Sequence, residues 1–215
     1  SQGVEYALVA HWRKIKVIKR NNNAPKLSPV KQIFAVSGSC SPTTADQILA
    51  AEANGFKILD FKAFKAIEPR CLAAELDYVY HKSLKYLSDG YDVLVTTAKG
   101  PNDPTIKLTT ETIKKANVPA AVPNERLGGA LGRLVSKISR KTRIQRIIIS
   151  GGDTSGHALT AVGVQALSAV APISPGAPLC QLHVPTDGRL NGLEVALKGG
   201  QMGTPSFFVR AKGGR

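Results

Sequence analysis

Cysteine is scarce in this sequence, with three among 215 residues: Cys40, Cys71 and Cys180. They lie far apart and show neither the spacing of a zinc site nor that of a redox motif. Their number and distribution exclude a disulfide framework, and none of them is an obvious nucleophile. Reduced thiols are typical of a cytoplasmic protein, which is the location we expect.

Long hydrophobic runs are also lacking. The best candidate, residues 158–173, is interrupted by Gln165 and Pro172 and is too short to span a bilayer. The first residues, Ser-Gln-Gly-Val-Glu-Tyr, contain neither an initiator methionine nor the basic-then-apolar pattern of a signal peptide. We therefore expect no membrane partner, and we expect the chain to be part of a longer protein. Its hydrophobic content of 43% suits one large folded domain.

Several familiar motifs are absent as well. The sequence contains no Gly-x-x-x-x-Gly-Lys-Ser/Thr, no Gly-x-Gly-x-x-Gly that opens a helix, and no Gly-x-Ser-x-Gly. The common P-loop, the dinucleotide fingerprint and the hydrolase elbow are thereby excluded. The four histidines lack zinc-ligand spacing with the cysteines, so we predict no metal-binding residues of this kind. If the protein binds a nucleotide, it must use a sequence motif other than these.

Acidic and aromatic residues are few. The sequence has 15 Asp and Glu residues and 29 Lys and Arg residues, which gives a formal net charge of +14. This positive charge must attract anions of some kind. Residues 13–20 alternate basic and apolar side chains as an exposed strand would, and Arg140, Lys141, Arg143 and Arg146 read as a solvated loop. Neither cluster has interleaved aromatics for base stacking, so we do not expect nucleic acid as a partner. A non-catalytic module that binds polyanions stays open as an alternative function.

The most informative stretch that is present is residues 147–156, Ile-Ile-Ile-Ser-Gly-Gly-Asp-Thr-Ser-Gly. Three β-branched residues predict a buried parallel strand, and the small and apolar residues 157–167 predict a helix after the turn. Glycines let the backbone approach an anion, and the free N–H groups of a helix N-terminus attract it.

Asp153 is the unusual member of this turn. A carboxylate repels phosphate unless it holds a metal ion or takes a proton from the attacking group, so it suggests catalysis. The alternative is that Asp153 or Thr154 only caps the helix. His157, one turn further on, is expected to be an ordinary solvated histidine.

The rest of the chain alternates strands with helices. Residues 4–12 have helical spacing, and residues 21–29 resemble a linker, so we divide the chain into residues 1–30 and a compact domain of residues 31–215. Within the domain we expect, in chain order, strand 33–36, helix 42–53 capped by Ser41, strand 57–60, helix 68–88, strand 91–97, loop 98–103, helix 123–139 and strands 176–184 and 193–198.

This order predicts an α/β fold: a mainly parallel, doubly wound sheet flanked by helices, with an antiparallel addition near the C-terminus. Ligands of such sheets sit at the carboxyl ends of the strands. Residues 37–41, 96–99 and 151–156 should therefore converge on one site. Residues 198–203, Lys-Gly-Gly-Gln-Met-Gly, offer further backbone amides, and Lys198 can meet a phosphate as a point charge.

Four segments, taken together and in this order, resemble the four-carbon acid sugar kinases. They are Ser-Gly-Ser-Cys-Ser-Pro at 37–42, Ser-Gly-Gly-Asp-Thr-Ser-Gly at 150–156, Pro-Gly-Ala-Pro at 175–178 and Leu-Lys-Gly-Gly-Gln-Met-Gly at 197–203. The resemblance covers residue 31 to the end. It implies that residues 31–215 are the C-terminal nucleotide-binding domain, that residues 1–30 are the interdomain helix and linker, and that an N-terminal acid-sugar domain is the natural partner.

The resemblance also implies a function. Members of the family are ATP- and Mg²⁺-dependent kinases that phosphorylate the terminal hydroxyl of 3-oxo-tetronate, or of D-threonate and D-erythronate. We favour 3-oxo-tetronate, and we expect this chain to be inactive alone and compatible with a homo-oligomer.

Carried onto this sequence, the resemblance assigns a set of residues to ATP. Gly199 and Gln201-Met202 stand where relatives commonly have Ser and Asn-Phe, so the contacts expected there are backbone contacts. Asp153 is the expected base or Mg²⁺ organiser. The residues expected to bind the cofactor are Ser37, Gly38, Ser39, Gly151, Gly152, Asp153, Thr154, Gly199, Gly200 and Gly203.

Overall fold

A computed structural model describes residues 2–19 and 25–213 of the chain. Its centre is a seven-stranded sheet with the order β2-β3-β1-β4-β7-β6-β5. The strands are β1 (Ile33–Ser37), β2 (Lys57–Asp60), β3 (Val93–Thr96), β4 (Arg146–Ser150), β5 (Ala166–Ser174), β6 (Ala177–His183) and β7 (Glu194–Lys198). The neighbouring strands β2, β3, β1, β4 and β7 pair parallel to one another. Strand β6 pairs antiparallel with both β7 and β5. The predicted α/β class, with its antiparallel addition, is confirmed.

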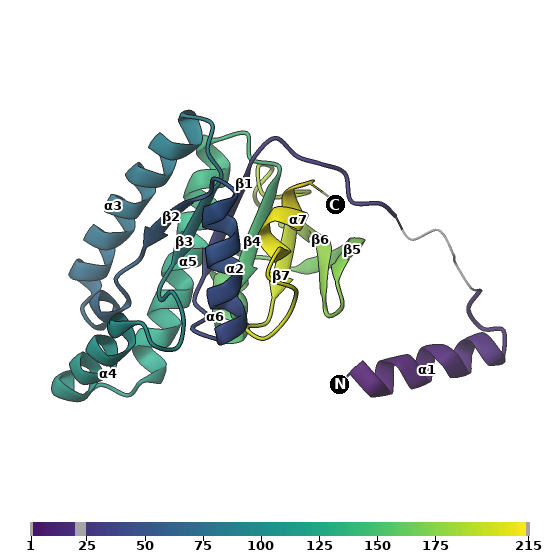
Figure 1. Ribbon diagram of the computed structural model, residues 1–215, viewed down its shortest axis with the longest axis horizontal. Helices are drawn as coiled ribbons and strands as arrows, with labels where there is room; N and C mark the ends of the chain where they lie inside the picture. The colour runs from purple at the N-terminus through teal and green to yellow at the C-terminus, as the bar shows by residue number, and fades with distance from the viewer. Residues whose placement is uncertain (1, 20–24, 214–215) are drawn as a thin grey trace.

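Helices cover both faces of this sheet (Figure 1). The helices of the described residues are α1 (Gln2–Lys14), which does not cover the sheet, α2 (Pro42–Ala53), α3 (Pro69–Ser88), α4 (Pro104–Ala116), α5 (Ala121–Lys141), α6 (Gly152–Val162) and α7 (Phe207–Gly213), with a short 3-10 helix η1 (Ala63–Ile67). None of the helices in the described part of the chain has both the length and the hydropathy needed to cross a membrane.

The side chains of each central strand alternate between two apolar clusters. Phe34 and Val36 of β1 pack with residues of α3, α5 and α6, whereas Ile33 and Ala35 pack with residues of α2 and α7. In Figure 1, α2 and α7 accordingly lie on the near side of the sheet. Because successive residues of a strand point to opposite faces, a sheet buried on both faces needs the continuous apolar runs that the sequence shows.

The order of the strands creates a switch point next to β1. From β1 the chain passes through α2 on one face, and from β4 it passes through α6 on the other, while β1 and β4 are direct neighbours. Two connections that leave adjacent strands toward opposite faces open a crevice at the carboxyl ends of those strands. The fold therefore places the turns after β1 and β4 side by side.

Close packing of α5 against α6 holds the second of these turns in place. A Cβ atom on Gly132 would lie 2.5 Å from the backbone oxygen of Ala158, and one on Gly128 would lie 2.6 Å from the Cβ of His157. His157 is half-buried in this contact, so it is not the fully solvated histidine that the sequence predicts. The small residues of α5 let the two helices approach each other.

We predict that Gly132→Ala destabilises the protein by at least about 2 kcal/mol, because the new methyl group meets backbone that cannot move without separating the helices. Gly156→Ala in α6 is the matched control. A Cβ there meets nothing within 4 Å, so this change should be neutral or stabilising by up to about 1 kcal/mol. Chemical denaturation of the two variants measures both effects, and equal stabilities would contradict the packing argument.

Most expected elements are present, and the loop predicted over 98–103 is confirmed, although helix α4, which was not predicted, follows it directly. Three expectations were wrong. The helix predicted over 157–167 is α6, which ends at Val162, and Ala166 already begins β5. Residues 13–19 form the end of α1 and a bend rather than a strand. Arg146 is fully buried instead of solvated: its guanidinium contacts Glu194 at 2.6 Å and donates to the carbonyl groups of Ser28 and Ala211.

The N-terminal segment differs from the rest. The predicted helix at 4–12 is confirmed as α1, which stands apart from the sheet in Figure 1 and exposes large apolar side chains such as Tyr6 and Trp12. Residues 21–24 of the linker predicted over 21–29 lie outside the described residues. The division of the chain at residue 31 stays a prediction, although the first strand begins two residues later.

Candidate functional site

The turns that follow β1, β4 and β7 line one cavity of about 370 Å³. Strand register places them together, since Ser37 pairs with Ser150 and Ser150 pairs with Lys198 at the ends of three adjacent strands. Backbone hydrogen bonds continue this alignment into the turns, from Gly38 to Ser150 at 2.9 Å and from Gly151 to Lys198 at 2.8 Å. The lining residues are Gly38, Ser39, Cys40, Ser41, Gly151, Gly152, Asp153, Thr154, Gly200 and Gln201.

Seven of the residues assigned to the cofactor from the sequence are in this lining, and three are not. Ser37 is fully buried at the end of β1, and its carbonyl group accepts a hydrogen bond from Thr97. Gly203 packs against Phe207 at the start of α7. Gly199 lies between Lys198 and the lining residue Gly200 without reaching the cavity itself.

Two glycines are required by the close approach of the first two turns. A Cβ atom on Gly38 would lie 2.0 Å from the hydroxyl of Thr154, so no other residue fits there without displacing that side chain. Gly151 has a φ of 116°, in a region that other residues rarely adopt. Gly152 differs from both, because a Cβ there meets nothing within 4 Å although the residue lines the cavity.

The N-terminus of α6 points at this cavity without a side-chain cap. Its N-cap residue is Gly151, and no side chain in the described part of the chain caps it, whereas Ser41 caps α2 by accepting a hydrogen bond from the Thr44 amide. The interpretation of Asp153 or Thr154 as the cap of α6 is therefore wrong. Uncapped N–H groups at a helix N-terminus form an anion-binding site.

A layer of hydroxyl groups lies beside the first and third turns. The Ser41 hydroxyl donates to the Gly200 carbonyl oxygen at 2.5 Å, and the Thr44 hydroxyl donates to the same oxygen at 3.0 Å. The hydroxyl groups of Ser39 and Thr44 are 2.9 Å apart. These contacts hold the Gly200 turn against the start of α2 and fix the shape of the cavity.

Lys198 lies beneath this layer with 1% of its surface exposed. Its Nζ donates to the Thr44 hydroxyl at 3.1 Å and to the carbonyl oxygens of Gly199 and Gly200 at 3.0 and 3.2 Å. No carboxylate among the described residues pairs with it. Burial lowers the pKa of Lys198 from 10.5 to about 8, because desolvation penalises the charged form. Because its partners are neutral, the charge of Lys198 is not balanced by a carboxylate, and it lies next to Gly200, which lines the cavity.

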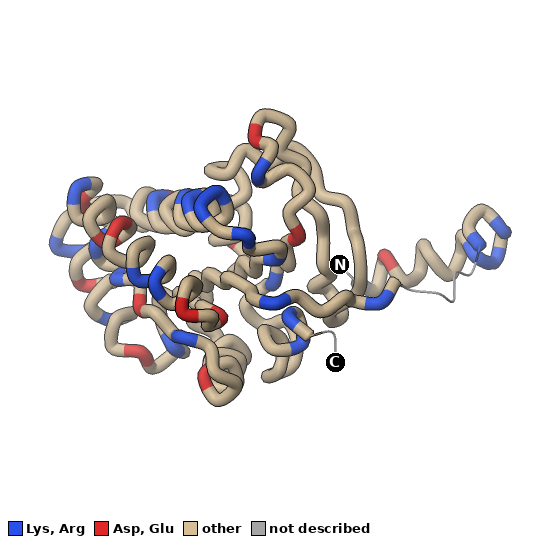
Figure 2. Tube along the Cα trace, turned by 90° about the horizontal axis from the view of Figure 1, so that it is seen from above, with Lys and Arg blue, Asp and Glu red and all other residues tan. Residues whose placement is uncertain are grey.

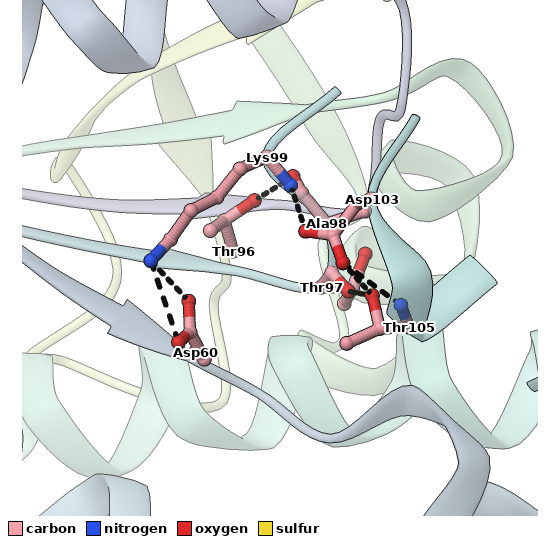
Figure 3. A network of polar contacts seen from close by, with 7 residues as sticks. All are labelled: Asp60, Thr96, Thr97, Ala98, Lys99, Asp103 and Thr105. Atoms are coloured by element: carbon pink, nitrogen blue, oxygen red, sulfur yellow. Dashed lines mark hydrogen bonds and ion pairs between the residues drawn. The ribbon is translucent and has the colours of Figure 1, made fainter. Parts of the chain in front are cut away.

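The fourth segment expected at the site, residues 96–99, lies beside it. The side chain of Lys99 pairs with Asp60 at 3.0 Å, and the Lys99 amide donates to Asp103 at 2.7 Å. Figure 3 shows both contacts. Asp103 also accepts hydrogen bonds from the Thr105 amide and hydroxyl, which fixes the first turn of α4. Burial alone would raise the pKa of Asp103, but the hydrogen bonds from Thr105 and Lys99 outweigh it and hold that pKa below its usual range.

Thr97 and Ala98 of this segment line a second cavity of about 440 Å³ that adjoins the first at Gly38 and Cys40. Sequence reasoning missed this cavity because it missed α4, which forms one wall. The signal was present in Asp103-Pro104, since Asp is a favoured N-cap and Pro a favoured first helical residue.

Comparison with known proteins extends these observations. Residues 34–208 match a family model described as a nucleotide-binding C-terminal domain. The whole chain is 36% identical to 46% of a 3-oxo-isoapionate kinase from Paraburkholderia graminis. Over 97% of its length it is 26% identical to 44% of a 3-oxo-tetronate kinase from Pseudomonas savastanoi pv. phaseolicola. The chain therefore spans a little under half the length of these curated relatives.

Solved structures share the fold. A Haemophilus influenzae protein superimposes with a TM-score of 0.71 at 19% identity, over 93% of this chain and 44% of its own. A Bordetella bronchiseptica protein, solved with bound citrate as a domain-swapped dimer, superimposes with a TM-score of 0.62 at 22% identity, over 88% of this chain and 41% of its own. The arrangement of sheet and helices thus recurs in larger proteins.

Proposed function

The chain belongs to the family of nucleotide-binding C-terminal domains of the four-carbon acid sugar kinases, and we propose that the cavity between its β1, β4 and β7 turns binds the phosphates of ATP. One observation carries this proposal: the uncapped N-terminus of α6 and two glycine-containing turns line a cavity, and a buried lysine with no carboxylate partner among the described residues donates to one of those turns, at Gly200. Backbone amides supply directional donors, and Lys198 supplies charge, as transferring phosphates require.

Among the described residues that line this cavity, Asp153 is the only one with a carboxylate. Among the described residues no cluster of three His, Cys, Asp or Glu side chains could hold a metal by itself. Mg²⁺ is commonly held by one or two carboxylates together with substrate phosphates and water, so a single aspartate beside a phosphate site fits this ion. Bound Mg²⁺ would neutralise charge on the phosphates. Asp153 then has one of two roles: it orients the ion, or it accepts the proton of the attacking hydroxyl.

The acceptor is proposed from the relatives. Their names share a 3-oxo acid sugar, and we propose such a compound, 3-oxo-tetronate or 3-oxo-isoapionate, in preference to D-threonate or D-erythronate. The other half of the relatives would supply most of the acid-sugar site. Phosphoryl transfer to a terminal hydroxyl is therefore a property of the complete enzyme, and this chain contributes the ATP half.

Polyanion binding by a basic surface is supported less well. Figure 2 shows Lys and Arg spread over many elements, with Asp and Glu among them. Several of the cations have partners inside the fold, such as Arg146 with Glu194, Lys65 with Glu75, and Lys212 with Asp92. A distributed charge of this kind does not form the basic stripe that tracks a nucleic-acid backbone.

A calorimetric titration with a non-hydrolysable ATP analogue and Mg²⁺ tests the proposed function. We expect one saturable site, with an affinity that changes little between 50 and 200 mM salt, conditions chosen because polyanion binding falls steeply over that range. Lys198→Met should lower the affinity roughly 30-fold, the equivalent of losing one charged interaction of about 2 kcal/mol. Lys82→Met, which changes an exposed lysine of α3, is the control. Absence of binding, or equal effects of the two variants, would contradict the proposal.

The depressed pKa of Lys198 gives this experiment a pH dependence. An anion in the cavity favours the charged ammonium, so the affinity for the ATP analogue should fall as the pH rises above about 8 in the wild type and stay constant in Lys198→Met.

The stability of the ligand-free protein should change with pH in the opposite direction. Between pH 8 and 10.5 the unfolded chain binds more protons than the folded one, so stability should rise with pH across this window.

A further inference from the structure

Other groups separate the ammonium group of Lys198 from the cavity. Its side chain is enclosed by protein and does not line the cavity. An ammonium group has three N–H donors and no acceptor. All three donors are used inside the protein, by the Thr44 hydroxyl and by the carbonyl oxygens of Gly199 and Gly200. Lys198 therefore has no N–H left for a phosphate, and its charge must act through one of these partners.

Thr44, a fully buried residue of α2, is the partner that also contacts a side chain of the cavity. Because its hydroxyl accepts from Lys198, its own hydrogen must point to another group. Two acceptors lie within reach of this hydrogen, the Gly200 oxygen at 3.0 Å and the Ser39 hydroxyl at 2.9 Å. The Gly200 oxygen already accepts from Ser41 and Lys198, which engages both of its lone pairs. Ser39 is therefore the better acceptor for the Thr44 hydroxyl.

Ser39 brings this chain of hydrogen bonds to the cavity, which it lines. Its hydroxyl oxygen is contacted by the Thr44 hydroxyl and, at 3.3 Å, by the amide of Ser41. With both lone pairs engaged, the Ser39 hydroxyl has only its hydrogen to offer. The acceptor for this hydrogen among the described residues is the Ser41 hydroxyl at 3.3 Å, which is long for a bond between two hydroxyl groups. An anion in the cavity would be a stronger acceptor.

We propose that Thr44 is a positioning residue that links Lys198 to Ser39 and turns the Ser39 hydroxyl toward the phosphates. The inference rests on the proposed function, because it takes the anion in the cavity to be the phosphates of ATP. Thr44 touches no ligand itself, since it is fully buried and does not line the cavity. Hydrogen bonds in a chain polarise one another, so the ammonium strengthens the donor at the far end of the chain. A lysine that cannot reach the phosphates thereby acts on them.

Four variants of the 215-residue chain test this inference. Thr44→Val keeps the shape of the side chain and removes its hydroxyl, whereas Thr44→Ser keeps the hydroxyl. Ser39→Ala removes the last donor of the chain, and a double variant combines Ser39→Ala with Thr44→Val. Thr160→Val, which removes an exposed hydroxyl of α6 that donates to Gly156, is the control.

Each variant is titrated with Mg²⁺ and a non-hydrolysable ATP analogue in a calorimeter. Circular dichroism verifies folding, and Thr44→Ala replaces Thr44→Val if the valine variant does not fold. We expect Thr44→Val and Ser39→Ala each to weaken binding about tenfold, as the loss of one hydrogen bond to a charged group would. Thr44→Ser and Thr160→Val should bind within about twofold of the wild type. The double variant should bind as Ser39→Ala does, because both residues act through one donor.

Losses that add in the double variant would assign Thr44 a separate structural role and overturn the inference. Failure of Thr44→Ser to restore binding would overturn it as well. If the wild type does not bind the analogue, the proposed function fails together with the inference. If the wild type binds it and folded Thr44→Val binds equally well, only the inference fails.

Discussion

Gly152→Val is expected to lower the affinity for an ATP analogue by more than about 100-fold while changing the free energy of unfolding by less than about 1 kcal/mol. Gly152 is the first residue of α6 and its φ is not in the left-handed region, so valine fits its backbone. A Cβ atom there meets no protein atom within 4 Å. The side chain would instead occupy the cavity in front of the helix N-terminus, where the phosphates are proposed to bind.

The matched control for this prediction is Gly156→Val, the same substitution one turn further along α6. Gly156 is also exposed and also meets nothing within 4 Å, but it does not line the cavity. Calorimetry and denaturation of both variants separate the two effects. Normal nucleotide binding by Gly152→Val would place the phosphates elsewhere, and an equal loss in both variants would indicate a general effect on α6.

Asp153→Asn is expected to lower kcat by at least about 1,000-fold with little change in nucleotide affinity. The amide keeps the size of the side chain but can neither accept a proton nor hold Mg²⁺ as a charged ligand. Asp153 is exposed and forms no ion pair in the described part of the chain, so its loss should not affect folding. The measurement needs an active enzyme, made by combining this chain with the other half of a curated relative.

Asp46→Asn provides the control for Asp153→Asn, since Asp46 is an exposed aspartate of α2 outside both cavities. Its kcat should equal that of the unchanged enzyme. Near-normal turnover by Asp153→Asn would remove Asp153 from both proposed roles. A change in the Mg²⁺ concentration needed for half-maximal rate would favour the role in metal binding over the role of base.

Much of the fold follows from local sequence signals. Ser41-Pro42 predicts the start of α2, Asn54-Gly55 predicts its end, and the apolar runs of β1 and β4 predict a sheet buried on both faces. Convergence of the β1 and β4 turns follows from topology, because carboxyl ends of parallel strands share one edge. These signals are reliable where each residue's preference agrees with its place in the fold.

Two misses have different physical causes. Residues 166–171, Ala-Leu-Ser-Ala-Val-Ala, are small and suit a helix, but antiparallel pairing with β6 makes them a strand, so tertiary contacts override local preference. Helix α4 buries none of its residues, and its amphipathic pattern was overlooked because of the Pro and Gly residues that precede it.

The sequence predicted which turns meet at the candidate site, but it did not predict which of their side chains are buried. The sequence indicates that residues 198–203 can meet a phosphate, but it does not indicate that Lys198 is buried beneath hydroxyl groups contributed by α2. That contact joins residues 154 positions apart in the chain and exists only after the sheet has formed. For the same reason, no local pattern predicts that Ser37 and Gly203 stay outside the cavity.

A crystal structure of this chain grown with Mg²⁺ and a non-hydrolysable ATP analogue tests the central claim most directly. The account predicts phosphate density between Gly38, Gly152 and Gly200, within hydrogen-bonding distance of the α6 N-terminal amides. Phosphates bound at any other place on the molecule, with this cavity holding only water, would contradict it.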